Sequence, residues 1–231
     1  MERSYSSSAR KLCNASSRHN RCLRLWKGKV MSQETTHAHH EHPDVVGSRN
    51  RLGVILIIVA DVAMALSILF VYFYLKGQNV NNMWLPTATE EVPATVPVSS
   101  MGAFYIAIIS AFGMLLNGYA LKGAKAKNQA QLTLGAMIAF AMSVIGLVYQ
   151  IQQMNSAPFT MRMGAYASCY YLIAGLNALH LALTAFISLG NWNRARLGLY
   201  KTDHWHVAII QVWWIWMTVS AALGAFALSF T

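Results

Sequence analysis

Five long apolar runs occupy most of the chain after residue 51, at about residues 52–75, 101–121, 132–153, 165–189 and 206–230. Each run has about the ~20 residues that a helix needs to cross ~30 Å of hydrocarbon. The runs are too long, and too rich in Ala, Leu, Met and Ile, for strands of about 4–8 residues. A transmembrane barrel would need many shorter, alternating segments. The pattern therefore predicts an all-α fold, a membrane bundle of five transmembrane helices.

The basic residues between these runs predict how the bundle is oriented. Lysine and arginine gather before the first run, after the second and after the fourth, at Arg49, Arg51, Lys122, Lys125, Lys127, Arg194, Arg196 and Lys201. The other side receives the C-terminus and the loop at 77–99, which contains Glu90, Glu91 and three prolines. Because loops rich in Lys and Arg stay on the cytoplasmic side, we expect the N-terminus inside and the C-terminus outside.

Composition agrees with lipid as the solvent, since 55% of the 231 residues are hydrophobic and 11% are charged. A soluble domain carries about a quarter charged residues. The net charge of +10 comes mostly from residues 1–31, where eight Lys or Arg and one acid give +7. The basic residues of the other part lie near helix ends, where they orient a membrane protein. We therefore expect no nucleic-acid partner.

Residues 1–48 are predicted to form a polar, disordered extension, basic at first and then rich in histidine, ahead of a transmembrane domain at 49–231. The stretch at 1–31 has the composition of an organellar transit peptide, but we favour an upstream segment translated from the wrong start codon, with Met31 as the natural start. The HAHHEH tract at 37–42 resembles a metal-binding tract, a pattern that is also common in flexible tails.

One acidic residue, Asp61, lies near the middle of the first apolar run. A charged side chain at that depth costs about 2.5–3.5 kcal/mol on insertion scales. Asp61 is therefore expected to stay protonated through desolvation or to face a polar partner within the bundle. An acid inside the membrane is a functional candidate by default. The alternative is a hydrogen-bonded packing residue with no role in turnover.

Polar residues also mark the fourth run, where Asn177 and His180 share one helical face and Thr184 lies a further turn along. This stripe is expected to face other helices. A single imidazole on an otherwise apolar helix favours a hydrogen-bonded structural role over metal ligation.

No cofactor is expected in this chain. His204 and His206 flank Trp205, and residues two apart point to different faces of a helix, so they are not expected to chelate together. The sequence has no pair of membrane histidines arranged for heme, no cysteine pair for copper or a cluster, and no C-x-x-C-H motif. Electron transfer through this chain is therefore not expected.

Three segments in order resemble subunit III of cytochrome c and quinol oxidases, in the short five-helix bacterial form. The first is the start of the first run, with Leu52, Gly53 and the intramembrane Asp61, where the family usually has Glu. The second is YYLIAGLNALHLALTAF, in which His180 falls on the family's histidine stretch and Asn177 stands where a first histidine is common.

The third segment is HWHVAIIQVWWIW, which is similar to the start of the family's last helix. It carries Trp205, His206 and Trp213 in the family pattern, and Gln211 stands where the family usually has Asp. The resemblance covers about residues 49–231.

The resemblance implies a non-catalytic subunit without a redox centre, located in the bacterial cell membrane. It would pack against the catalytic subunit I and other subunits of a heme-copper oxidase, stabilise the catalytic subunit and support proton uptake. Heme and copper are then expected in the partner subunit, and phospholipid in a cleft between helix groups. Besides the intramembrane acid Asp61, the implied lipid or subunit contacts are Asn177, His180, Trp205, His206, Gln211 and Trp213.

Three other functions fit parts of the sequence. A nitric-oxide-reductase accessory protein of the same family would also be short and can carry Asp in its first helix. A small transporter or channel could line its path with Asp61, Tyr149, Gln150, Gln153 and His180. A membrane metalloenzyme would have to use Asp61, His180 and His206, although a denser ligand cluster is usual.

Overall fold

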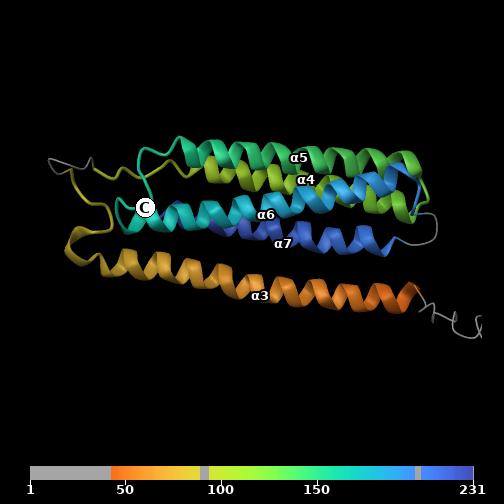
Figure 1. Ribbon diagram of the computed structural model, residues 1–231, viewed down its shortest axis with the longest axis horizontal. Coiled ribbons are helices and arrows are strands. Elements are labelled where there is room, and N and C mark those ends of the chain that lie inside the picture. Colours follow the sequence, from red (N-terminus) through yellow and green to blue (C-terminus); the bar gives the residue numbers. More distant parts are fainter. Residues whose placement is uncertain (1–42, 89–93, 201–203, 231) are drawn as a thin grey trace, which may run out of the picture. The chain divides into compact units, whose positions relative to one another are not determined.

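The computed structural model describes residues 43–88, 94–200 and 204–230. Within these ranges the chain is helical and has no strand (Figure 1). The elements are α3 (Pro43–Gln78), the short 3-10 turn η1 (Val80–Asn82), α4 (Met101–Lys125), α5 (Gln129–Asn155), α6 (Ala165–Arg196) and α7 (Trp205–Leu228). The five α-helices in the described ranges are each long and apolar enough to cross a membrane. The predicted all-α fold with five such helices is confirmed.

The helices extend beyond the apolar runs that predicted them. α3 begins at Pro43, so residues 43–48, which the sequence assigns to the polar extension, are helical. α6 continues to Arg196, past the predicted end at 189, and carries Arg194 and Arg196 in its last turn, where cations interact favourably with the helix dipole. The rest of the predicted extension, including the histidine-rich tract, lies outside the described residues.

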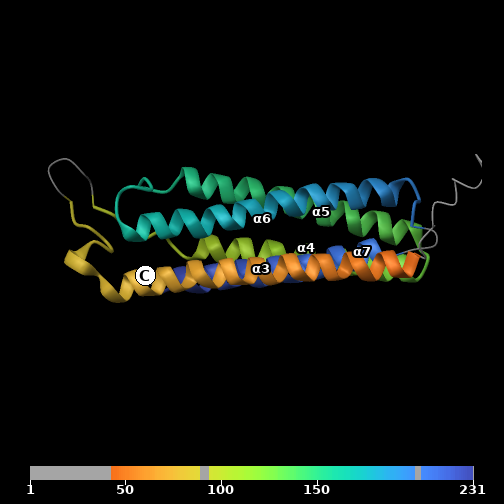
Figure 2. The same ribbon diagram turned by 60° about the horizontal axis from the view of Figure 1, so that its bottom comes forward.

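Helices α4 to α7 pack in a ring, α4 against α5 and α7, and α6 against α5 and α7. Figure 2 shows α5 and α6 in one layer and α4 and α7 in the next. Glycine allows close approach of α4 and α5: a Cβ added at Gly135 of α5 would lie 2.8 Å from the backbone nitrogen of Ala120 in α4. Small residues of this kind let membrane helices come together without a hydrophobic driving force.

Helix α3 packs its backbone less closely on the other described helices than they pack on one another, and its side chains make most of the contacts. Near its start, Gly47 leaves little room beside Trp205, since a Cβ there would lie 3.0 Å from the indole Cγ. Near its end, the rings of Phe73 and Phe230 meet edge to face, with 6.1 Å between centroids. Tyr72 of α3 is also fully buried in a hydrophobic cluster with Trp84 and Tyr166, so side-chain packing attaches α3 to the other helices.

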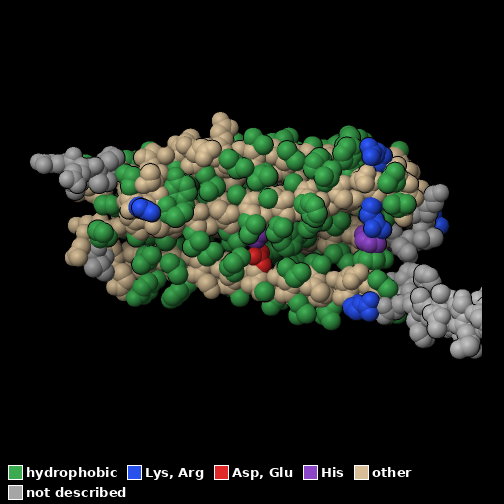
Figure 3. Space-filling view, in the orientation of Figure 1, with side chains coloured by type: hydrophobic (Ala, Val, Ile, Leu, Met, Phe, Trp, Pro, Cys, Tyr) green, Lys and Arg blue, Asp and Glu red, His purple; other side chains and the backbone are tan. Residues whose placement is uncertain are grey.

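The outer surface is mainly apolar, and the basic side chains lie at its ends (Figure 3). At one end of the helices are Arg49, Arg51, Lys122, Lys125, Lys127, Arg194 and Arg196. At the other end are Lys76 and Arg162. Such a surface suits a bilayer, with hydrocarbon around the middle and headgroups around the ends.

Candidate functional site

A buried acid–imidazole pair connects α3 to α6. The Oδ2 atom of Asp61 lies 2.8 Å from Nε2 of His180, and the two side chains are 11% and 3% exposed. No other acidic side chain is described, and Figure 3 shows a single acidic patch in the middle of a largely apolar face. The polar partner that the sequence required for Asp61 is therefore His180.

Helix α7 supplies two indoles to the same site. The Nε1–H of Trp216 donates a hydrogen bond to Oδ2 of Asp61. Trp213 meets the His180 ring edge to face, with 5.8 Å between centroids, and its Nε1–H donates to the Thr184 hydroxyl at 2.8 Å. That hydroxyl donates in turn to the backbone carbonyl of His180 at 2.6 Å. The imidazole is thus contacted from two other helices, by Asp61 of α3 and Trp213 of α7.

The charge of the pair follows from its surroundings. If Asp61 and His180 share one proton, the pair carries no net charge, which an apolar interior favours over a lone carboxylate. In that state Nδ1 of His180 bears a hydrogen, because the imidazole is either doubly protonated or accepts at Nε2. Nδ1 is buried and has no hydrogen-bond partner among the described residues. An unpaired buried donor costs about 1–3 kcal/mol.

A second polar network lies toward the basic end of the bundle. Asn117 Nδ2 donates to Gln211 Oε1 at 2.8 Å, and Asn191 Nδ2 lies 3.5 Å from Asn117 Oδ1. The Tyr200 hydroxyl donates to Asn191 Oδ1 at 2.9 Å. Burial raises the pKa of the Tyr200 phenol above its usual range, and the nearby Arg194 opposes this shift. Gln211 therefore joins α7 to α4 in a network separate from the acid–imidazole pair.

The remaining residues from the sequence prediction take other places. Asn177 is buried, with 6% of its surface exposed, on the same face of α6 as His180. Trp205 and His206 stack on each other at the start of α7, with 3.5 Å between ring centroids. The structure thus brings Asp61, His180 and Trp213 together and leaves these two aromatic residues outside the site.

Comparison with known sequences agrees with the segments quoted above. The family profile for cytochrome c oxidase subunit III matches residues 12–222 of the 231. The chain belongs to the cytochrome c oxidase subunit III family. This confirms the family resemblance found in the sequence, and the five apolar helices fit a multi-pass membrane subunit.

Relatives named cytochrome c oxidase subunit 3 come from cyanobacteria and fungi. That of Synechocystis sp. is 27% identical over 185 residues, which cover 79% of this chain and 74% of the relative. That of Thermostichus vulcanus is 27% identical over 199 residues, covering 84% of this chain and 92% of the relative. That of Trichophyton rubrum is 24% identical over 194 residues, covering 80% of this chain and 67% of the relative. The similarity therefore extends over most of the subunit III chain.

Sequence reasoning missed Trp216, although it lies three residues after Trp213 and so on a neighbouring part of the same helix face. It also stopped the polar stripe of α6 at Thr184. Ser188 and Asn191 continue that stripe at the same spacing of three or four residues, and both are 2% exposed. The spacing was visible in the sequence, but the burial of the face was not.

The described part of the chain contains no group of three or more His, Cys, Asp or Glu side chains that could hold a metal ion. The set of Asp61, His180 and His206, which the metalloenzyme alternative requires, is therefore not assembled. The HAHHEH tract at 37–42 lies outside the described residues.

Proposed function

We propose that this chain is the non-catalytic, cofactor-free third subunit of a respiratory heme-copper terminal oxidase. In this role it stabilises the catalytic subunit I, which holds the heme and copper, and supports proton uptake. Family membership supports the assignment to an oxidase. The observation that supports the role is the buried pair of Asp61 and His180, at 2.8 Å, with Trp216 bonded to the same carboxylate oxygen.

The pair has the chemistry that proton uptake requires. Both partners can bind and release a proton, and imidazole does so near neutral pH more readily than any other side chain. An ionisable group inside a membrane bundle is typical of proton pathways. The indole and hydroxyl contacts hold the two groups in place, so a proton can be exchanged without a large movement of α3.

The apolar outer surface supports the remaining parts of the proposal. Large hydrophobic side chains on α3, such as Leu56 and Phe70, are 60% and 68% exposed in the isolated chain. Subunit I, other oxidase subunits and bound phospholipid would cover such a surface. The gathering of basic side chains at one end supports an inside N-terminus and an outside C-terminus in a bacterial cell membrane.

A pull-down from native membranes in mild detergent tests the assignment. We expect heme-bearing subunits to stay with the tagged chain through washing, and an untagged strain is the control. A colourless homomeric complex would contradict the proposal and favour the transporter. Consumption of nitric oxide in place of oxygen by the recovered complex would instead identify a reductase accessory subunit.

Two variants of one position test the role of the pair. Asp61→Asn keeps the shape of the side chain but removes the ionisable group, so the complex should assemble while its turnover declines within minutes. Asp61→Glu, the residue usual in the family, keeps the ionisable group and should sustain turnover. Oxygen consumption by the purified complexes measures both. Equal endurance of the Asn variant and wild type would reduce the pair to a packing role.

A further inference from the structure

Two hydrogen-bond contacts meet at one oxygen of the Asp61 carboxyl group. Nε2 of His180 lies 2.8 Å from Oδ2 of Asp61, and the Nε1–H of Trp216 donates to the same Oδ2 atom. A proton that Asp61 and His180 share can lie either on Oδ2 or on Nε2. The contact from Trp216 distinguishes these two positions.

The indole of Trp216 can only donate, because its nitrogen carries one hydrogen and accepts no hydrogen bond. If the shared proton were on Oδ2, this oxygen would be the hydroxyl of a carboxylic acid, and it would have to accept from Trp216 while it donates to Nε2. If the proton is on Nε2, Oδ2 is a carboxylate oxygen with two lone pairs for its two donors. Hydrogen bonds to an ionised acceptor are also roughly twice as strong as those between neutral groups. The contacts therefore favour a carboxylate beside an imidazolium.

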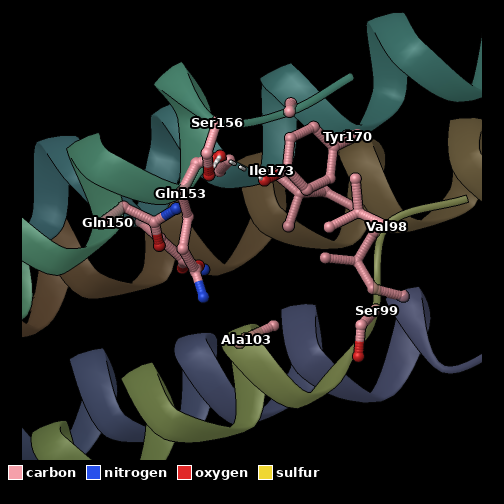
Figure 4. A pocket seen from close by; sticks show the side chains of 13 residues that line it. Val98, Ser99, Ala103, Gln150, Gln153, Ser156, Tyr170 and Ile173 are labelled. Carbon is pink, nitrogen blue, oxygen red and sulfur yellow. Dashed lines mark hydrogen bonds between the residues drawn. The ribbon is translucent and has the colours of Figure 1, made fainter. Parts of the chain in front are cut away.

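The surroundings of the pair make the bond from Trp216 important. No hydrogen bond from a described residue other than His180 and Trp216 reaches the Asp61 carboxyl group. A cavity of about 220 Å³ lies near the end of α7, where Gln150 and Gln153 extend from α5 toward α4 (Figure 4), but none of the three residues of the site lines it. A buried ion pair is favourable only if further hydrogen bonds satisfy its remaining lone pairs. Trp216 supplies such a bond to the carboxylate.

We propose that Trp216 is a positioning residue that keeps the shared proton on Nε2 of His180, so that Asp61 is a carboxylate in the resting pair. Loss of the indole N–H removes one of the two donors to Oδ2. The proton then moves to Oδ2, which gives a neutral carboxylic acid beside a neutral imidazole. What this proton does during turnover rests on the proposed function, whereas its location does not.

Infrared difference spectroscopy of the intact complex measures the protonation of Asp61. Subtraction of the Asp61→Asn spectrum from that of the wild type isolates the bands of this carboxyl group. Near neutral pH we expect carboxylate bands and no C=O band of a protonated carboxyl group. The same subtraction in a Trp216→Phe background should contain the protonated C=O band. The ratio of acid to carboxylate should rise at least about tenfold, because a hydrogen bond to a charged group is lost.

Two neighbouring tryptophans of α7 provide matched controls. Trp214→Phe removes an indole whose N–H is buried without a partner among the described residues. Trp213→Phe removes the hydrogen bond to the Thr184 hydroxyl but no donor to Asp61. Both variants should keep the carboxylate bands. A protonated Asp61 in these variants as well would show that loosening of α7, and not loss of the N–H of Trp216, moves the proton.

A tryptophan analogue provides a second test that does not depend on recovery of the Trp216→Phe complex. Benzothienylalanine at position 216 keeps the shape of tryptophan but has sulfur in place of the N–H. Only the hydrogen bond to Asp61 is then lost, and the same protonated C=O band should appear.

A protonated C=O band of Asp61 in the wild type, or its absence from both changes at Trp216, would overturn the proposal. The spectra require no turnover and can be recorded on whatever complex the chain forms. A failed pull-down of heme subunits would therefore contradict the proposed function without deciding where the proton lies.

Discussion

The pair of Asp61 and His180 makes a specific prediction for a double-mutant cycle with leucine. His180→Leu leaves the Asp61 carboxyl with Trp216 as its only described polar partner. Asp61→Leu leaves both the Trp216 Nε1–H and the His180 Nε2 atom without their hydrogen-bond partner. The double variant removes both ionisable groups and retains two apolar side chains that suit a membrane interior.

The expected sizes follow from the burial of the pair. Removal of one partner of a buried ion pair costs about 3–5 kcal/mol, while replacement of both by apolar residues is often neutral or stabilising. We therefore expect each single variant to lose about 3 kcal/mol, which is about a hundredfold in the folding equilibrium since 1.4 kcal/mol is tenfold. The double variant should stay within about 1 kcal/mol of wild type.

These differences are measured by unfolding the subunit with increasing amounts of a denaturing detergent and following its tryptophan fluorescence. Ser188→Ala is the control, because its hydroxyl lies on the same face of α6, is buried and has no partner among the described residues. That variant should be neutral or slightly stabilising. If the costs of the two single variants simply add in the double variant, the pair is not coupled and the reasoning is refuted.

Two further predictions concern other parts of the bundle. Gly135→Ala should destabilise the subunit by about 1–3 kcal/mol in the same assay, because its Cβ would lie 2.8 Å from the backbone nitrogen of Ala120. Gly175→Ala is the control and should be neutral or stabilising, because nothing lies within 4 Å of the added Cβ. Tyr200 has a raised pKa, so its contribution is complete below about pH 10 and should be lost as pH rises through the folded-state value. Tyr200→Phe should cost about 1 kcal/mol at pH 8 through its bond to Asn191, and its melting temperature should fall less than that of wild type above pH 10.

The number and type of helices could be predicted from the sequence because a membrane span requires a long apolar run. The helix ends could not, since a polar flank is compatible with either a loop or a helix that continues into the headgroup layer. Residues 43–51 illustrate this, because they contain two arginines and one glycine yet belong to α3. In the structure, Gly47 of this segment packs beside Trp205, a contact that the sequence does not reveal.

The candidate site was predictable in part for a similar reason. An acid in the middle of a span must have a compensating partner, so the requirement at Asp61 could be stated from the sequence alone. The identity of that partner depends on which helices are neighbours and on their rotation. His180 and Trp216 become partners of Asp61 only because α6 and α7 present those faces to α3.

The position of α3 and the protonation of the pair are physically linked. α3 packs its backbone less closely on the other described helices than they pack on one another, and the hydrogen-bonded pair is a polar attachment near the middle of the span, beside the hydrophobic cluster around Tyr72. Gain or loss of one proton gives the pair a net charge, and a net charge in an apolar interior is unfavourable. The same step changes which atoms can donate between Asp61 and His180. We therefore expect a change in the proton count of the pair to change how tightly α3 is held.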